Sequence, residues 1–226
     1  MSMLFSVCLA IHIVAGSTGL ITGTINCLRK KGDKWHVRTG RLFTYGMLTA
    51  GFAALVLALL HPNDFLFIVG LFTIYLVGTG KRYVYYKILR PETRAGIIDW
   101  MLSAGMITGS VLFIFLGTRQ LVRGNSFGVV PIIFAGIGLL FAVTDIRYYQ
   151  TASKPKQRWL TAHLQRMMGG FIAALTAFLV VNSSYLLPPI PAFVYWLLPT
   201  AVLVPLIFRW SRQYGPKKNK QTSSLS

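Results

Sequence analysis

Long apolar stretches limit what this sequence can fold into more than any other feature does. A helix that crosses a bilayer needs about 20 mostly apolar residues, and seven stretches approach or reach that length: 3–27, 42–60, 65–80, 99–117, 128–145, 166–186 and 192–210. Apolar residues make up 54% of the chain and charged residues only 12%, which is too little polar surface for a soluble globule. We therefore predict an all-α polytopic membrane protein, a bundle of seven transmembrane helices.

The two ends of the chain differ in character. The first Lys or Arg is Arg29, so the opening stretch lacks the basic start of a signal peptide, and we expect it to be a retained transmembrane helix. The last residues, GPKKNKQTSSLS, are polar and have no periodicity. We therefore expect residues 1–210 to form one helical-bundle domain and residues 211–226 to form a disordered, basic cytoplasmic tail.

The basic residues predict an orientation. Of the 23 Lys and Arg residues, 21 lie at the loops after the first, third and fifth stretches and at the end of the seventh. Loops rich in Lys and Arg tend to stay in the cytoplasm, so we predict that the N-terminus is outside and the C-terminus inside. This distribution explains the net charge of +18 without nucleic acid, and it makes the lipid bilayer the expected partner. Aromatic residues at the same ends predict an interfacial belt: Tyr83, Tyr85, Tyr86, Tyr148, Tyr149 and Trp159.

Titratable residues within membrane helices are costly and usually functional. Five of them map to the predicted cytoplasmic ends: His36, Asp99, Asp145, His163 and Arg166. Two interpretations remain open. The residues form a hydrogen-bonded cluster that ties the helix ends together, or His36, Asp99, Asp145 and His163 bind a metal ion together with a water. No HxxxH, HExxH or CxxC spacing is present, so the metal interpretation depends on topology alone.

Two arginines are candidates for binding a small anionic ligand at the same end, namely Arg41 and Arg166. Arg166 lies three residues after His163 and therefore on the same helical face. Its side chain either pairs with Asp145 or snorkels to the lipid headgroups, and snorkelling is the usual behaviour of such a residue.

His12 is a separate candidate, for binding a cofactor or for carrying protons. It lies about 13 Å into the first helix at 1.5 Å per residue, on the face that carries Gly16, Gly19 and Gly23, so we expect it to face protein and not lipid. It could serve a transporter or proton pathway, bind haem in an electron-transfer protein, or simply hydrogen-bond to a neighbouring helix. Haem ligation needs a second histidine at matching depth, and no other span has one in its middle.

Four segments carry a wider pattern: HIVAGSTGLITG, KWHVRTGRLFTYGML, DIRYY and WLTAHLQRMMGGFIAALTAFLVVN. They contain His12, an H-x-x-x-G-R motif at His36, Gly40 and Arg41, and an H-x-x-R-M motif at His163, Arg166 and Met167. These segments resemble the bacterial family of predicted membrane proteins known as DUF2306. The resemblance implies a multi-pass helical bundle in a bacterial inner membrane. It implies no particular activity, so whether the protein is an enzyme is open at this point.

Overall fold

The fold is taken from a computed structural model, which describes residues 3–88, 94–151, 158–186 and 191–215. All regular structure in these ranges is helical. The long helices are α1 (Met3–Leu28), α2 (Lys34–Leu60), α3 (Asp64–Ile88), α4 (Ile97–Val122), α5 (Val129–Gln150), α6 (Arg158–Val181) and α8 (Ala192–Tyr214). Two short helices complete the list, the 3-10 turn η1 (Ser126–Gly128) and α7 (Ser183–Leu186).

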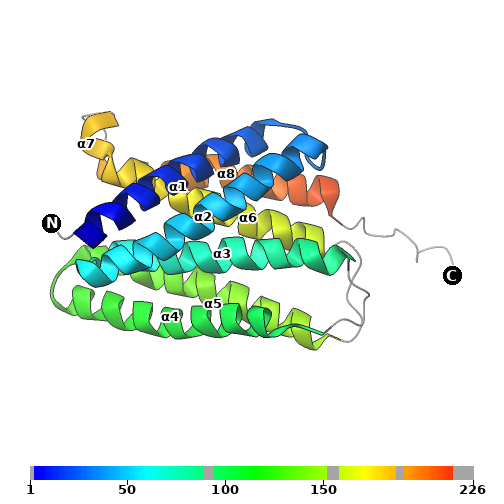
Figure 1. The fold of residues 1–226 in the computed structure, drawn as a ribbon. Helices are drawn as coiled ribbons and strands as arrows, with labels where there is room; N and C mark the ends of the chain where they lie inside the picture. Colours follow the sequence, from blue (N-terminus) through cyan, green and yellow to red (C-terminus); the bar gives the residue numbers. More distant parts are fainter. Residues whose placement is uncertain (1–2, 89–93, 152–157, 187–190, 216–226) are drawn as a thin grey trace, which may run out of the picture.

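The seven long helices are each long and apolar enough to cross a membrane. They run back and forth, so that α1, α3 and α5 end at the side of the bundle where α2, α4 and α6 begin, and α8 also ends there (Figure 1). The prediction of an all-α bundle with seven membrane-spanning helices is confirmed. We call this end of the bundle the basic end, because 21 of the 23 Lys and Arg residues lie in the sequence between or beside these helix ends.

Helix α3 lies at the centre of the bundle. It has α1 and α2 on one side and α4 and α5 on the other (Figure 1), and α3 also packs closely against α6. Its middle carries the fully buried side chains Tyr75, Leu76, Val77 and Thr79. Helices α4 and α5 form a hairpin that packs mainly within itself and meets α3 along one side. The hairpin and the remaining helices are thus two groups that meet mainly along α3.

Several helices extend beyond their predicted limits. α2 begins at Lys34 because Asp33 caps it, accepting a hydrogen bond from the backbone N–H of His36 at 2.6 Å. His36 is therefore in the first turn of α2. Helix α3 continues to Ile88 through the aromatic segment KRYVYYK, and α6 begins at Arg158. The hydropathy pattern stops short of these turns because they carry Lys and Arg, which are compatible with a helix that emerges from the membrane. For the third helix the sequence already allowed a continuation through KRYVYYK, and the structure has it.

The expected domain boundary at residue 210 falls inside α8, which continues to Tyr214. The predicted tail from residue 216 onward lies outside the described residues.

Candidate functional site

A buried ion pair lies between α5 and α6. A guanidinium nitrogen of Arg166 on α6 donates to Oδ1 of Asp145 on α5, and the two side chains are 1% and 0% exposed. Gly80 on α3 lets α6 pack closely against α3 at Arg166, because a Cβ at position 80 would lie 3.0 Å from the Cβ of Arg166. Arg166 therefore does not snorkel to the headgroups. Its guanidinium is paired with the carboxylate of Asp145 inside the bundle.

Two tyrosines from α3 complete the coordination of Asp145. The hydroxyl of Tyr75 donates to Oδ2 at 2.5 Å and the hydroxyl of Tyr83 donates to Oδ1 at 2.7 Å. The two tyrosines are eight residues apart, slightly more than two helical turns, so they lie on one face of α3. Asp145 thus receives three hydrogen bonds from two other helices, which is how a buried carboxylate is stabilised.

Arg166 is less well satisfied than its partner. Besides Asp145, its side chain donates to the backbone carbonyl of Phe141 at 3.3 Å, and the guanidinium carbon lies 4.1 Å from the ring centre of Phe141 and 5.5 Å from that of Tyr83. Its Nε is buried and has no hydrogen-bond partner among the residues that the structure describes. A buried donor without an acceptor costs about 1–3 kcal/mol. The guanidinium of Arg166 therefore keeps one N–H, at Nε, that is free to bind a further acceptor.

A second ion pair lies nearer the basic end. Nε and Nη2 of Arg82 on α3 donate to the two carboxylate oxygens of Asp99 at 2.7 and 2.8 Å. The hydroxyl of Tyr86 and the backbone N–H of Gly96 also donate to Asp99, at 2.7 and 2.8 Å. Asp99 belongs to the first turn of α4, where a negative charge is favourable. Unlike Arg166, Arg82 makes a two-pronged contact with its carboxylate.

The two ion pairs follow one pattern. Each carboxylate comes from the α4–α5 hairpin, and each is bound by an arginine and by at least one tyrosine from α3 or α6. Tyrosine rings fill the space around them, with ring centres of Tyr83 and Tyr148 5.2 Å apart and those of Tyr86 and Tyr148 5.7 Å apart. The hairpin is therefore joined to the rest of the bundle by charge at the basic end.

The histidines have other partners. Nδ1 of His163 lies 2.8 Å from the carbonyl oxygen of Gly80, and Nδ1 of His12 lies 2.9 Å from that of Ala50. Because a carbonyl only accepts, Nδ1 carries the proton in both rings. The ring of His61 packs edge-on against Phe5, with centres 4.4 Å apart. Nδ1 of His36 is buried and has no hydrogen-bond partner within the described part of the chain. His12 thus has a hydrogen-bonding role between α1 and α2.

The predicted ligands do not form a common metal centre. Within the part of the chain that the structure describes, no three His, Cys, Asp or Glu side chains are grouped so that they could hold a metal ion. Asp99 and Asp145 are instead each bound to an arginine. Arg41, the other predicted anion ligand, is exposed on α2 and takes part in neither ion pair.

Sequence reasoning missed Tyr75 and Arg82, and it assigned most of the tyrosines wrongly. Tyr83, Tyr86, Tyr148 and Tyr149 were expected in an interfacial belt, yet they are 1%, 7%, 3% and 8% exposed, whereas Tyr85 is 48% exposed. The available signal was the spacing of eight residues between Tyr75 and Tyr83, which aligns two hydroxyls on one face of a helix.

Comparisons with known proteins add no further assignment, because no family model, curated protein or solved structure matches the chain. The resemblance to DUF2306 stays a prediction. The chain is a multi-pass membrane protein in which one buried and one partly buried ion pair join the α4–α5 hairpin to α6 and α3.

Proposed function

We propose that this protein is a membrane transport protein that binds a small anionic solute at Arg166, in exchange for the carboxylate of Asp145. The observation that supports this proposal is the buried Arg166–Asp145 pair, in which the acid is fully hydrogen-bonded while the Nε of the base lacks a partner. Ionisable groups within membrane helices usually mark a substrate or ion pathway.

Charge balance favours exchange over simple addition. A buried guanidinium needs one negative partner, and removing that partner typically costs about 3–5 kcal/mol. An incoming carboxylate or similar anion can take the place of Asp145 and use the free Nε as well, which would give the two-pronged contact that Arg82 already makes with Asp99. Arg166 then stays paired throughout the exchange.

Exchange would couple the anion to a proton. Once it has left Arg166, Asp145 retains only the hydroxyls of Tyr75 and Tyr83. A buried carboxylate without a cation is costly, and uptake of a proton removes that cost. The solute would therefore bind together with a proton, as in a proton-coupled carrier.

The α4–α5 hairpin is the element that would move. It carries both acids and packs mainly within itself, so separating it from α3 and α6 requires opening the two ion pairs. Motion of one helical group against another around a central site is the general mode of alternating access in membrane carriers.

Thermal denaturation of the purified protein in detergent tests the proposal, with formate, acetate, nitrate and chloride as probes at constant ionic strength. At least one anion should raise the Tm of the wild type through mass action. Asp145→Asn should respond more strongly, because it removes the competing carboxylate and leaves Arg166 in place. The anion that stabilises the protein should then be taken up by proteoliposomes when a proton gradient is applied.

Arg166→Gln should abolish the response to anions. Arg82→Gln is the matched control, because it also removes an arginine from an ion pair with a buried carboxylate but leaves Arg166 intact, and it should retain the response. A response that survives in Arg166→Gln, or a complete lack of response in both the wild type and Asp145→Asn, would contradict the proposal.

We also propose that the protein lies in a bacterial inner membrane with its basic end in the cytoplasm. The supports are the location of 21 of the 23 Lys and Arg residues at that end and the resemblance to DUF2306.

A further inference from the structure

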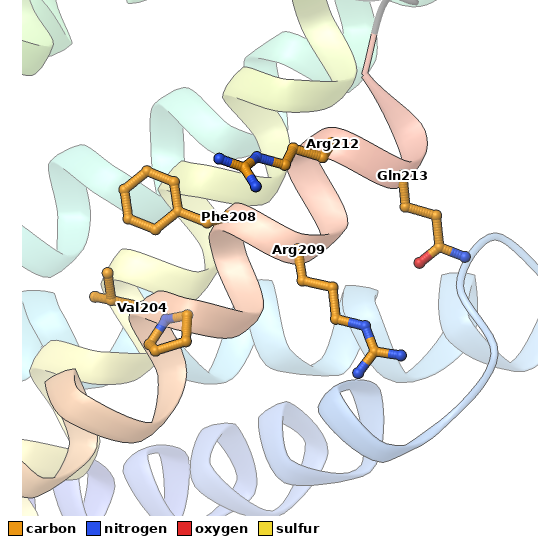
Figure 2. A pocket seen from close by; sticks show the side chains of 6 residues that line it. Val204, Phe208, Arg209, Arg212 and Gln213 are labelled. Atoms are coloured by element: carbon orange, nitrogen blue, oxygen red, sulfur yellow. The ribbon is translucent and has the colours of Figure 1, made fainter.

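The outward face of α8 carries a shallow pocket near the basic end. Figure 2 shows its side chains in two neighbouring rows along the helix. The lining residues are Val204, Pro205, Phe208, Arg209, Arg212 and Gln213. Phe208 is 63% exposed, and both arginines are exposed as well. The pocket thus has an apolar part followed, one turn further along, by a cationic part.

The position of this change from apolar to cationic matches the bilayer. At 1.5 Å per residue, Arg209 lies about 25 Å along a helix that begins at Ala192, whereas the hydrocarbon core is about 30 Å thick. Val204 and Phe208 therefore lie at the depth of acyl chains. Arg212, about 30 Å along the helix, and Gln213 lie at the depth of lipid headgroups, and the long side chain of Arg209 reaches the same depth by snorkelling along the last turn.

The two arginines lack an acidic partner among the residues described. The ion pairs there are Arg29–Asp33, Arg82–Asp99 and Arg166–Asp145. Arg209 and Arg212 are three residues apart, so their side chains emerge on neighbouring sides of one helical turn. Guanidinium groups bind phosphate oxygens through two parallel hydrogen bonds, and this geometry suits a phosphodiester.

We propose that the α8 pocket binds the headgroup of an anionic phospholipid. Arg209 and Arg212 contact the phosphate, the amide of Gln213 donates to a headgroup oxygen, and an acyl chain lies along Val204 and Phe208. The occupant is a lipid and not a free phosphate, because the apolar part of the pocket continues directly from the cationic part towards the middle of the membrane. This site is separate from Arg166 and does not depend on the proposed transport function.

Native mass spectrometry of the full-length protein in detergent tests this proposal, with phosphatidylglycerol and phosphatidylcholine as probes. The wild type should retain phosphatidylglycerol in preference to phosphatidylcholine. Arg209→Gln combined with Arg212→Gln should weaken phosphatidylglycerol binding about thirtyfold, from about 1 kcal/mol for each cation near anionic lipid. Both positions are exposed, so folding should be unchanged, as far-UV circular dichroism can verify.

Arg38→Gln combined with Arg41→Gln is the matched control, because these exposed arginines belong to the basic end of α2 and their loss changes the net charge equally. The control should bind phosphatidylglycerol as the wild type does. If the two double variants lost phosphatidylglycerol binding equally, the loss would be an effect of net charge alone, and the proposal would be overturned. Unchanged binding in Arg209→Gln/Arg212→Gln, or equal retention of the two lipids by the wild type, would overturn it as well.

Discussion

Asp145 and Arg166 carry charges that cannot reach water, since their side chains are 0% and 1% exposed. A buried ion pair adds little net stability compared with apolar residues of the same volume, yet breaking it is expensive because one charge is left alone. Stability alone therefore does not explain why an ion pair occupies this position. An ion pair beside an Arg166 Nε that has no partner among the described residues is better explained by a binding role.

This asymmetry predicts the outcome of a double-mutant cycle. Asp145→Leu alone should lower the free energy of unfolding by about 3–5 kcal/mol, because Arg166 stays buried without its carboxylate. Adding Arg166→Met should recover most of the loss, although the hydroxyls of Tyr75 and Tyr83 still lack their acceptor. Unfolding by sodium dodecyl sulfate, followed by circular dichroism, gives both values. A double variant as unstable as Asp145→Leu would contradict the argument.

At the scale of single elements, the start of α2 should depend on pH. The carboxylate of Asp33 accepts a hydrogen bond from the backbone N–H of His36, and this bond lowers the pKa of Asp33. The cap is therefore fully formed above the ordinary aspartate pKa of about 3.9, and its contribution is lost as the pH falls through the lowered value. Hydrogen-exchange protection of the first turn of α2 should fall over that acid range. Asp33→Asn, which still accepts a hydrogen bond but does not titrate, should remove the pH dependence.

Packing of α1 on α2 depends on a close backbone approach. A Cβ added at Gly46 would lie 2.8 Å from the carbonyl oxygen of Ala15, and a backbone atom cannot move aside as a side chain can. Gly46→Ala should therefore destabilise the protein by about 1–3 kcal/mol and make α1 more accessible to protease. Gly16→Ala is the control on the facing helix, because its nearest neighbour would be the Cβ of Ala50 at 3.9 Å. That variant should be neutral or slightly stabilising, and equal effects of the two would contradict the packing argument.

At the scale of the whole molecule, the orientation follows from charge and not from packing. Reporter fusions at Asn63 and Gly124 should report an outside location, and fusions at Gly32, Pro91 and Pro155 an inside location. Activity of alkaline phosphatase and fluorescence of green fluorescent protein distinguish the two sides. The opposite pattern would place both ion pairs near the outer surface and would contradict the proposed orientation.

The sequence by itself determined the number of spans and the end of the bundle at which the titratable residues gather. Hydropathy reports the cost of placing each segment in lipid, which is a local property. Short connections then send successive helices in opposite directions, so Asp99, Asp145 and Arg166 must lie toward one end. From the sequence, the side chain of Arg166 could either pair with Asp145 or snorkel to the headgroups, and the sequence did not decide between the two.

Only the tertiary structure decided which side chains meet. That choice depends on how each helix is rotated about its axis, and α5 is almost equally apolar all round, so its sequence does not indicate which face turns inward. Packing turned Tyr75 and Tyr83 toward Asp145 and left Tyr85 exposed. It also placed each carboxylate against an arginine, so that the described His and Asp side chains do not gather in one group. The physical reason is that insertion into lipid selects segments by composition, whereas contacts between helices are selected by shape and by the pairing of buried polar groups.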